Sequence, residues 1–170
     1  MSSEPIPTQI EPRGQHRQPL EMVLEAHPFM RGLPPAYLRL IAECAKMRSV
    51  APGHYVWRQG DRNIEAYLVL EGEIALEITV PHEGTLSFES VNTGEVAGCT
   101  ALFQSVRWGF DGRAVTAVRA MVLDSRRLRA VIECDHEFGY QLLERCANSL
   151  GNRLNATRLK LVETHSATLS

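Results

Sequence analysis

The sequence predicts an α+β fold, an antiparallel β jelly-roll barrel flanked by N-terminal helices and a long C-terminal helix. Apolar residues follow helical spacing before residue 48 and again from residue 125. Between these regions, short alternating segments are separated by turn signals at intervals of roughly eight to twelve residues. Short strands at such intervals are typical of an antiparallel barrel or jelly roll.

The length of 170 residues suits one domain with a substantial core. Hydrophobic residues make up 44% of the chain and charged residues 22%, which is typical of a globular protein. Four segments are expected: a flexible tail over 1–19, N-terminal helices over 20–48, the jelly roll over 49–124 and C-terminal helices over 125–170.

The tail is predicted from four prolines and a lack of apolar periodicity in residues 1–19. Residues 20–29 predict a short helix that Pro28 stops. Residues 33–47 predict a second helix, because a proline suits its first turn and several apolar residues share one face. That face comprises Leu38, Ile41, Cys44 and Ala45.

The strands are expected to begin near Val50, where the apolar residues change from helical spacing to alternation with polar residues. A Pro-Gly turn at residues 52–53 and a Glu-Gly turn at residues 71–72 each separate two predicted strands. Alternation continues over residues 86–90, and residues 113–124 are expected to form one later strand.

Two helices complete the predicted fold, with Ser125 and Asp135 as their expected N-caps. The long second helix carries an apolar seam whose members are spaced four and three residues apart in alternation, as in a coiled coil. A homodimer along this seam is expected, and packing of the seam on its own barrel is the alternative. The seam comprises Leu143, Ala147, Leu150, Leu154, Thr157 and Leu161.

Five segments resemble, in the same order, parts of the cyclic-nucleotide-binding domain, the sensor module of catabolite activator protein and of protein kinase A regulatory subunits. They are APGHYVWRQGD, YLVLEGEIAL, GEVAGCTALF, DSRRLRAVIECD and RLNATRLKL. The third segment resembles the family's phosphate-binding cassette. The resemblance covers about residues 29–162, marks this chain as a divergent bacterial member and implies the jelly-roll fold.

In that family a Gly-Glu pair opens a short helix that meets the cyclic phosphate, and an Arg clamps the phosphate. Here Gly98 matches the glycine, but Cys99 stands at the Glu position and Trp108 at the Arg position. Arg107 would replace this Arg if the loop turns its side chain inward. Adjacent residues of an extended segment face opposite sides, so Arg107 and Trp108 are not both expected to enter the pocket. Arg113 is a further candidate that is expected to face solvent. The ligand-binding residues that the resemblance implies are Gly98, Cys99, Thr100, Ala101, Leu102, Arg107, Trp108 and Thr157.

These departures predict weak binding of cyclic AMP or cyclic GMP, because a hydrogen bond to a charged group contributes about 1.5–3 kcal/mol. Trp108 and Phe110 are two residues apart in an extended segment, so their side chains point to the same side. They either fill a closed pocket or line an aromatic pocket for another small molecule. Thr157 matches a position that reaches the purine in the family, although a polar seam residue also serves to fix dimer register. A redox role for Cys99 and a packed neutral thiol both remain open.

Other function classes lack the residues that they need. The histidines at 16, 27, 54, 82, 136 and 165 form no metal-ligand pair, and the four cysteines form no CxxC motif. No catalytic residues, no metal and no resident cofactor are therefore expected, and the protein is not expected to be an enzyme. No DNA-reading helix follows the long helix, and the net charge is −2, so direct nucleic-acid binding is not expected.

No segment has a membrane-spanning or secretory pattern, so a cytoplasmic protein without a membrane partner is expected. The predicted function is that of a stand-alone sensor domain, a small-molecule-responsive regulatory subunit that acts on an unidentified effector protein. The alternative is a dimeric scaffold protein whose vestigial pocket binds no nucleotide.

Overall fold

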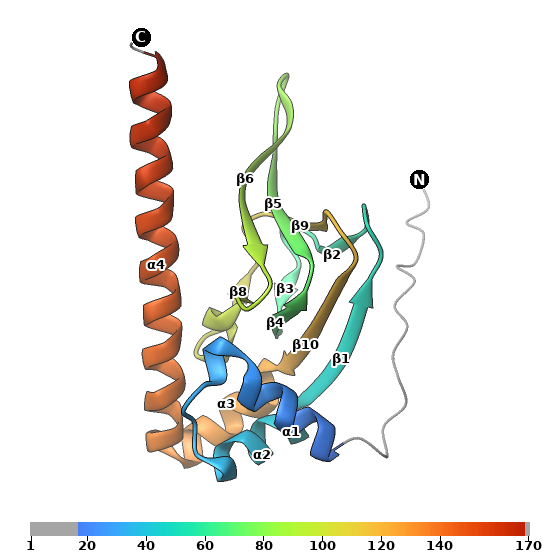
Figure 1. Ribbon diagram of the computed structural model, residues 1–170, viewed down its shortest axis with the longest axis vertical. Helices are drawn as coiled ribbons and strands as arrows, with labels where there is room; N and C mark the ends of the chain where they lie inside the picture. The colour runs from blue at the N-terminus through green and yellow to red at the C-terminus, as the bar shows by residue number, and fades with distance from the viewer. Residues whose placement is uncertain (1–16, 169–170) are drawn as a thin grey trace.

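The computed structural model describes residues 17–168, in which two four-stranded sheets and a two-stranded ribbon form a jelly roll with helices at one end (Figure 1). The helices are α1 (Arg17–Ala26), η1 (Pro28–Met30), α2 (Pro35–Glu43), η2 (Cys99–Leu102), α3 (Ser125–Cys134) and α4 (His136–Thr168). The strands are β1 (Ala45–Val50), β2 (Tyr55–Trp57), β3 (Arg62–Asn63), β4 (Glu65–Glu71), β5 (Glu73–Val80), β6 (Gly84–Asn92), β7 (Val96–Ala97), β8 (Val106–Arg107), β9 (Asp111–Ala114) and β10 (Val118–Asp124).

The sheets have the orders β1-β10-β4-β7 and β2-β9-β5-β6, and β3 pairs with β8. The first sheet is buried on both faces. On β10, Met121 and Leu123 pack against the helices, whereas Ala120 and Val122 point toward the second sheet. This alternation follows from the pleat of a strand, in which neighbouring side chains leave opposite faces. The molecule therefore has two apolar cores, one between the helices and the first sheet and one between the two sheets.

Helix α4 packs on the body of the protein only along its first half. Phe138, Leu142 and Cys146 are buried in the helical core. From Leu154 to Ser166 every residue is exposed, and Figure 1 shows this upper half rising beside the β5–β6 hairpin. The apolar periodicity of α4 therefore serves two surfaces, one buried and one open to solvent.

Two predicted boundaries at the N-terminal end are wrong. The predicted helix over residues 33–47 ends at Glu43, and β1 begins at Ala45. Ala45 pairs with Leu123 of β10, so cross-strand pairing overrides the helical spacing of this segment. Helix α1 begins at Arg17, inside the predicted tail, and residues 1–16 lie outside the described residues.

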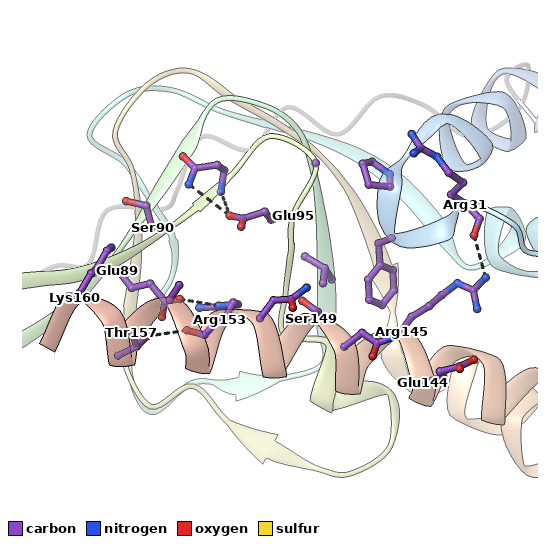
Figure 2. Close-up of a pocket in the computed structure, with 18 residues that line it drawn as sticks. Arg31, Glu89, Ser90, Glu95, Glu144, Arg145, Ser149, Arg153, Thr157 and Lys160 are labelled. Atoms are coloured by element: carbon purple, nitrogen blue, oxygen red, sulfur yellow. Dashed lines mark hydrogen bonds and ion pairs between the residues drawn. The ribbon is translucent and has the colours of Figure 1, made fainter. Parts of the chain in front are cut away.

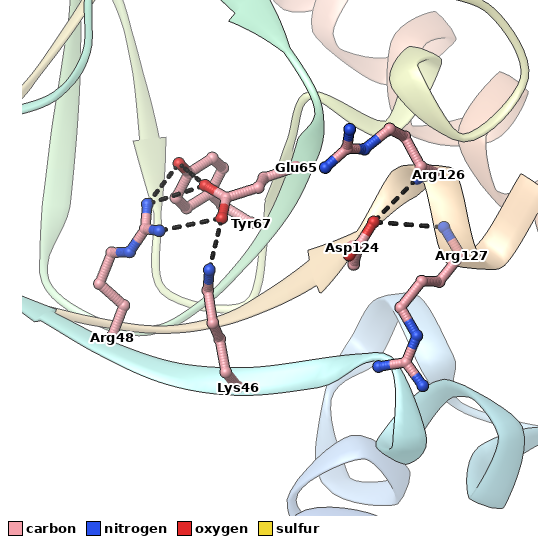
Figure 3. Close-up of polar contacts among 7 residues, drawn as sticks. All are labelled: Lys46, Arg48, Glu65, Tyr67, Asp124, Arg126 and Arg127. Atoms are coloured by element: carbon pink, nitrogen blue, oxygen red, sulfur yellow. Dashed lines mark hydrogen bonds and ion pairs between the residues drawn. The ribbon is translucent and has the colours of Figure 1, made fainter. Parts of the chain in front are cut away.

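Two predicted features of the region before α3 are also corrected. The single strand expected over residues 113–124 is interrupted at residues 115–117, where the Thr116 hydroxyl accepts a hydrogen bond from the Glu73 amide. The N-cap of α3 is Asp124 rather than Ser125 (Figure 3). The Asp124 carboxylate accepts from the amides of the next helical turn, at 3.0 and 3.2 Å.

The jelly-roll fold with its long final helix is confirmed, and so are the turn and cap that local chemistry predicted. Gly72 joins β4 to β5 with a left-handed φ of 94°, and the Asp135 carboxylate accepts from the Phe138 amide at 3.0 Å. No helix within residues 17–168 combines the length and the apolar character that a membrane span requires.

Candidate functional site

The phosphate-cassette segment is held close to the first sheet by Gly98, which has a left-handed φ of 73°. A Cβ at this position would lie 2.7 Å from the Trp108 ring and 2.8 Å from the Glu65 carbonyl oxygen. Only glycine therefore fits both the conformation and the space. This close approach places the first residues of η2 between the first sheet and α4.

The side chains of η2 point mainly into the helical core. Cys99, Ala101 and Leu102 are buried, and Thr100 is half-buried. The Cys146 thiol of α4 donates to the Cys99 carbonyl oxygen across 3.7 Å. A hydrogen bond with Cys99 and burial together raise the pKa of the Cys146 thiol. The structure thus brings Gly98 and these four residues of η2 together, with Cys99 packed beside a second thiol.

Trp108 occupies the space between the two sheets. It is 8% exposed and stacks on Trp57 of β2, with ring centroids 4.0 Å apart and planes inclined by 11°. Tyr67 lies 5.2 Å from the Trp57 ring and Phe110 lies 6.3 Å from the Trp108 ring. We call these four side chains the aromatic cluster. It fills the interior at the position where the family resemblance places an arginine.

Sequence reasoning missed Trp57 and the glycine that accommodates it. A Cβ at Gly112 of β9 would lie 2.3 Å from the Trp57 ring, so the indole rests directly on the bare backbone of this strand. The only sequence signal is a glycine within a strand, which often marks a close approach.

Neither candidate arginine enters the aromatic cluster. Arg107 is exposed, as the predicted alternation requires, and its guanidinium donates to the Gly60 carbonyl oxygen at 2.6 Å. The expectation that Arg113 faces solvent is met in part, since its side chain is 36% exposed. Arg113 donates to the buried Glu77 carboxylate at 2.9 Å, because the pairing of β5 with β9 sets the two residues on one face.

A polar network adjoins the aromatic cluster on the inner face of the first sheet (Figure 3). The Tyr67 hydroxyl donates to the Glu65 carboxylate at 2.7 Å and accepts from the Arg48 guanidinium at 2.7 Å. Lys46 also donates to Glu65 at 2.7 Å. Although burial opposes ionisation, hydrogen bonds from Lys46 and Tyr67 and the charge of Arg48 hold the pKa of Glu65 below its ordinary value. The cations nearest this interior are therefore already engaged by a carboxylate of the same chain.

A groove of about 680 Å³ runs between α4, β6 and the turn that leads into β7 (Figure 2). This volume is within the range of small-molecule sites. Thr157 lines the groove, and its hydroxyl donates to the Arg153 carbonyl oxygen at 3.0 Å. The other charged or polar side chains that line it are Arg31, Glu89, Ser90, Asn92, Glu95, Glu144, Arg145, Asn148, Ser149, Asn152, Arg153 and Lys160.

One ion pair crosses the groove. The Arg153 guanidinium of α4 donates to the Glu89 carboxylate of β6 at 2.9 Å. Their side chains are 21% and 18% exposed, so both charges are largely withdrawn from water. Sequence reasoning missed this pair, since 64 residues separate its members.

The predicted seam of α4 lies on the exposed side of the helix. All six members are exposed, with Leu143 at 49%, Leu150 at 43% and Leu161 at 67%. The seam is thus separate from the buried face and available to a partner. No group of three or more histidine, cysteine, aspartate or glutamate side chains within residues 17–168 is arranged to hold a metal ion.

Comparison with known proteins bears on these features. A model of the cyclic nucleotide-binding domain family matches residues 47–135. A curated Rhodopseudomonas palustris protein, named as a potassium channel protein, is 25% identical over 115 residues. The match covers 68% of this chain and 27% of that relative, so the chain spans about a quarter of the relative's length.

Solved structures share the fold. A cyclic nucleotide-binding domain from Methylobacillus flagellatus matches with a TM-score of 0.77 and 15% identity, over 92% of this chain and 89% of that chain. The regulatory subunit of a cAMP-independent protein kinase A from Trypanosoma cruzi, bound to guanosine, matches with a TM-score of 0.65 and 20% identity. The latter match covers 86% of this chain and 51% of that chain.

Proposed function

Because the chain belongs to the cyclic nucleotide-binding domain family, we propose that it is a regulatory sensor domain with a weakened or altered response to cyclic nucleotides. The observation that carries this proposal is the stack of Trp108 on Trp57 between the two sheets. An indole at this position offers no positive charge to a cyclic phosphate, and the nearby cation Arg48 is engaged by Glu65.

The energetic argument has two parts. The missing Glu and Arg each remove a hydrogen bond to a charged group, which weakens binding by about tenfold to a hundredfold per bond. A ligand entering between the sheets must also displace Trp108, and stacked aromatic pairs contribute about 0.5–1.5 kcal/mol beyond their buried area. Both effects weaken the binding of a cyclic nucleotide, whereas neither weakens the binding of a ligand of different chemistry elsewhere on the domain.

The Trypanosoma cruzi regulatory subunit supports this interpretation by analogy. That protein is described as independent of cAMP and is bound to guanosine. A regulatory subunit that contains this fold is thus found with a bound nucleoside that is not a cyclic nucleotide. We infer the same kind of divergence here. The four cysteines are free thiols, which suits a cytoplasmic location.

Output is proposed to pass through α4 and a homodimer. The exposed seam gives a second copy an apolar face, and the buried first half of the same helix contacts η2 through Cys146. A change at the cassette would therefore be transmitted to the dimer and to an effector protein. The second candidate function is a dimeric scaffold without a ligand, which the filled interior and the exposed seam also favour.

Calorimetric titration with cyclic AMP and cyclic GMP tests the proposal. The wild-type protein is expected to bind either nucleotide with a Kd weaker than about 100 μM. The double variant Cys99→Glu with Trp108→Arg restores both missing groups and is expected to bind cyclic AMP at least about tenfold more tightly. Wild-type binding near 1 μM would refute the weakened response. If the wild-type protein binds neither nucleotide and a broad ligand screen also finds no binder, the scaffold function is supported.

A further inference from the structure

Two of the four cysteines meet inside the helical core. Cys99 of η2 and Cys146 of α4 are 47 residues apart in the sequence, and they are 4% and 2% exposed. The Cys146 sulfur atom lies 3.7 Å from the Cys99 carbonyl oxygen, and its thiol group is also within hydrogen-bonding reach of the Cys99 sulfur atom. The fold therefore brings together two thiols that the sequence keeps far apart.

The two thiols differ in acidity, although both are buried. The hydrogen bond from Cys146 lowers the pKa of the Cys99 thiol, and burial opposes this shift. The positive charge of Arg153 and two backbone amides also lower the pKa of Cys99. The same hydrogen bond raises the pKa of Cys146. Cys99 is thus the member of the pair that reacts more readily as a thiolate, and Cys146 is the member that keeps its proton.

The other two cysteines are placed differently. Burial raises the pKa of the Cys44 thiol, although the charge of Arg127 opposes this shift. Cys134 is exposed at the end of α3. An acidic thiol beside a second thiol is the arrangement in which oxidation ends at a disulfide. Cys99 and Cys146 therefore have the arrangement that a reversible thiol oxidation requires.

The burial of both sulfur atoms determines which oxidants can reach them. A bulky disulfide such as oxidised glutathione would have to separate η2 from α4, whereas hydrogen peroxide is close to water in size. Phe29 and Val96 line the groove and belong to the same core cluster as the two thiols. A local opening of this cluster would therefore admit a small hydroperoxide.

We propose that Cys99 and Cys146 form a modification site at which hydrogen peroxide converts the two thiols into an intramolecular disulfide. The Cys99 thiolate attacks one oxygen of the peroxide, which breaks the O–O bond and forms a sulfenic acid. The hydroxide that leaves takes up the proton lost from Cys99. The Cys146 sulfur then attacks the Cys99 sulfur, so the S–S bond forms and the S–O bond breaks. The second hydroxide leaves with the Cys146 proton, and the balance is one disulfide and two water molecules.

The disulfide would join η2 to the buried first half of α4. Its formation requires the two sulfur atoms to approach to about 2 Å, so a small movement of η2 toward α4 accompanies the reaction. A low-molecular-weight dithiol would reverse the reaction by exchange. The site does not depend on the proposed response to cyclic nucleotides, so failure of either proposal leaves the other unaffected.

Peroxide treatment of the full-length Cys134→Ser protein tests the proposal, because this background lacks the exposed thiol and its disulfides between molecules. After treatment with about 1 mM hydrogen peroxide, alkylation in urea and mass spectrometry are expected to show a peptide that links Cys99 to Cys146 and a free thiol at Cys44. The midpoint of urea unfolding is expected to rise by about 1–2 M, since the bond closes a long loop. Dithiothreitol should reverse both changes.

Two further variants in this background assign the roles of the thiols. Cys146→Ala leaves Cys99 without a partner thiol, so dimedone is expected to trap a sulfenic acid at Cys99 and no disulfide should form. Cys44→Ala is the matched control, since it removes a different buried thiol and should form the disulfide as the background protein does.

Three results with the folded background protein would overturn the proposal. They are three thiols that survive the peroxide, a disulfide that includes Cys44, and a sulfinic acid at Cys99 in place of a disulfide. A bond between Cys99 and Cys146 that forms only after unfolding in urea would also overturn it, because the native contact would then have no part in the reaction.

Discussion

Single residues decide what the space between the sheets contains. Trp108 and Trp57 fill it, and two glycines permit their placement, Gly98 beside the Trp108 ring and Gly112 beneath the Trp57 ring. The aromatic cluster converts a position associated with ionic binding into part of an apolar core. The stacked rings therefore account both for the stable packing of the aromatic cluster and for the absence of a charged group within it.

Gly98→Ala is expected to destabilise the protein by about 3 kcal/mol, because left-handed strain is combined with a clash against Trp108 and the Glu65 carbonyl. Gly60→Ala is the matched control. Gly60 has a similar φ of 87° but nothing within 4 Å of its added Cβ, so only the strain of about 1 kcal/mol is expected. Urea unfolding of both variants measures the difference, and equal losses would show that Trp108 moves aside freely.

The helix α4 illustrates how one element serves three surfaces. Phe138 and Leu142 face the core, Arg153 and Lys160 face the groove, and Leu150 lies on the exposed seam. A period of 3.6 residues gives a helix enough separate faces for this division. The same element can therefore contact a ligand, the cassette and a second copy at once.

Leu150→Asp is expected to convert a dimer into a monomer, because it places a charge at the centre of the seam. Leu159→Asp is the control. Leu159 is 65% exposed on the same helix but lies outside the seam spacing, so this variant should remain dimeric. Light scattering coupled to gel filtration measures both masses. A Leu150→Asp protein that keeps the mass of a dimer would exclude the seam as the interface.

The elements that were predicted correctly depend on neighbours in the sequence. The turn at Gly72 and the cap at Asp135 need only local chemistry, so both were identified from a few residues. The end of α2 at Glu43 was not predicted correctly, because the pairing of Ala45 with a strand distant in the sequence determines where the helix ends. The same limit applies to the site. The cassette position of Gly98 followed from a sequence resemblance, whereas Arg153–Glu89 and Trp57–Trp108 arise only from the folded chain.

At the scale of the whole molecule, the two cores meet at the first sheet and the helices are fastened to it by few polar contacts. One such contact is His27, which is 4% exposed. Its Nδ1 accepts from the Phe29 amide at 3.2 Å, and its Nε2 lies 3.3 Å from the Val69 carbonyl oxygen of β4. This arrangement requires a neutral ring that donates through Nε2.

Folding stability is therefore expected to fall as the pH falls. Burial lowers the pKa of His27 below its ordinary value of 6.5, although the hydrogen bond to Val69 opposes the shift. Below about pH 6.5 the unfolded chain binds a proton at this residue while the folded chain does not, so protonation favours unfolding. The loss attributable to His27 is at most about 1.4 kcal/mol per pH unit.

Urea unfolding between pH 7.5 and pH 5.5 tests this dependence. His27→Asn retains a side-chain acceptor before η1 but cannot titrate, so its stability should change less with pH than that of the wild type. His54→Asn, which alters an exposed histidine, should follow the wild type. Identical slopes for all three proteins would remove His27 as the source of the pH dependence.

The accessibility of the cysteines provides a means of observing a dimer directly. Cys134 is exposed at the end of α3, whereas Cys44, Cys99 and Cys146 are buried. A maleimide dye would therefore label the native chain at one place, directly before the first turn of α4. In a parallel pairing of two α4 helices, the two dyes would sit at the same end and transfer energy efficiently. In an antiparallel pairing they would be separated by nearly the full helix, about 50 Å, so a fluorescence measurement distinguishes the two orientations.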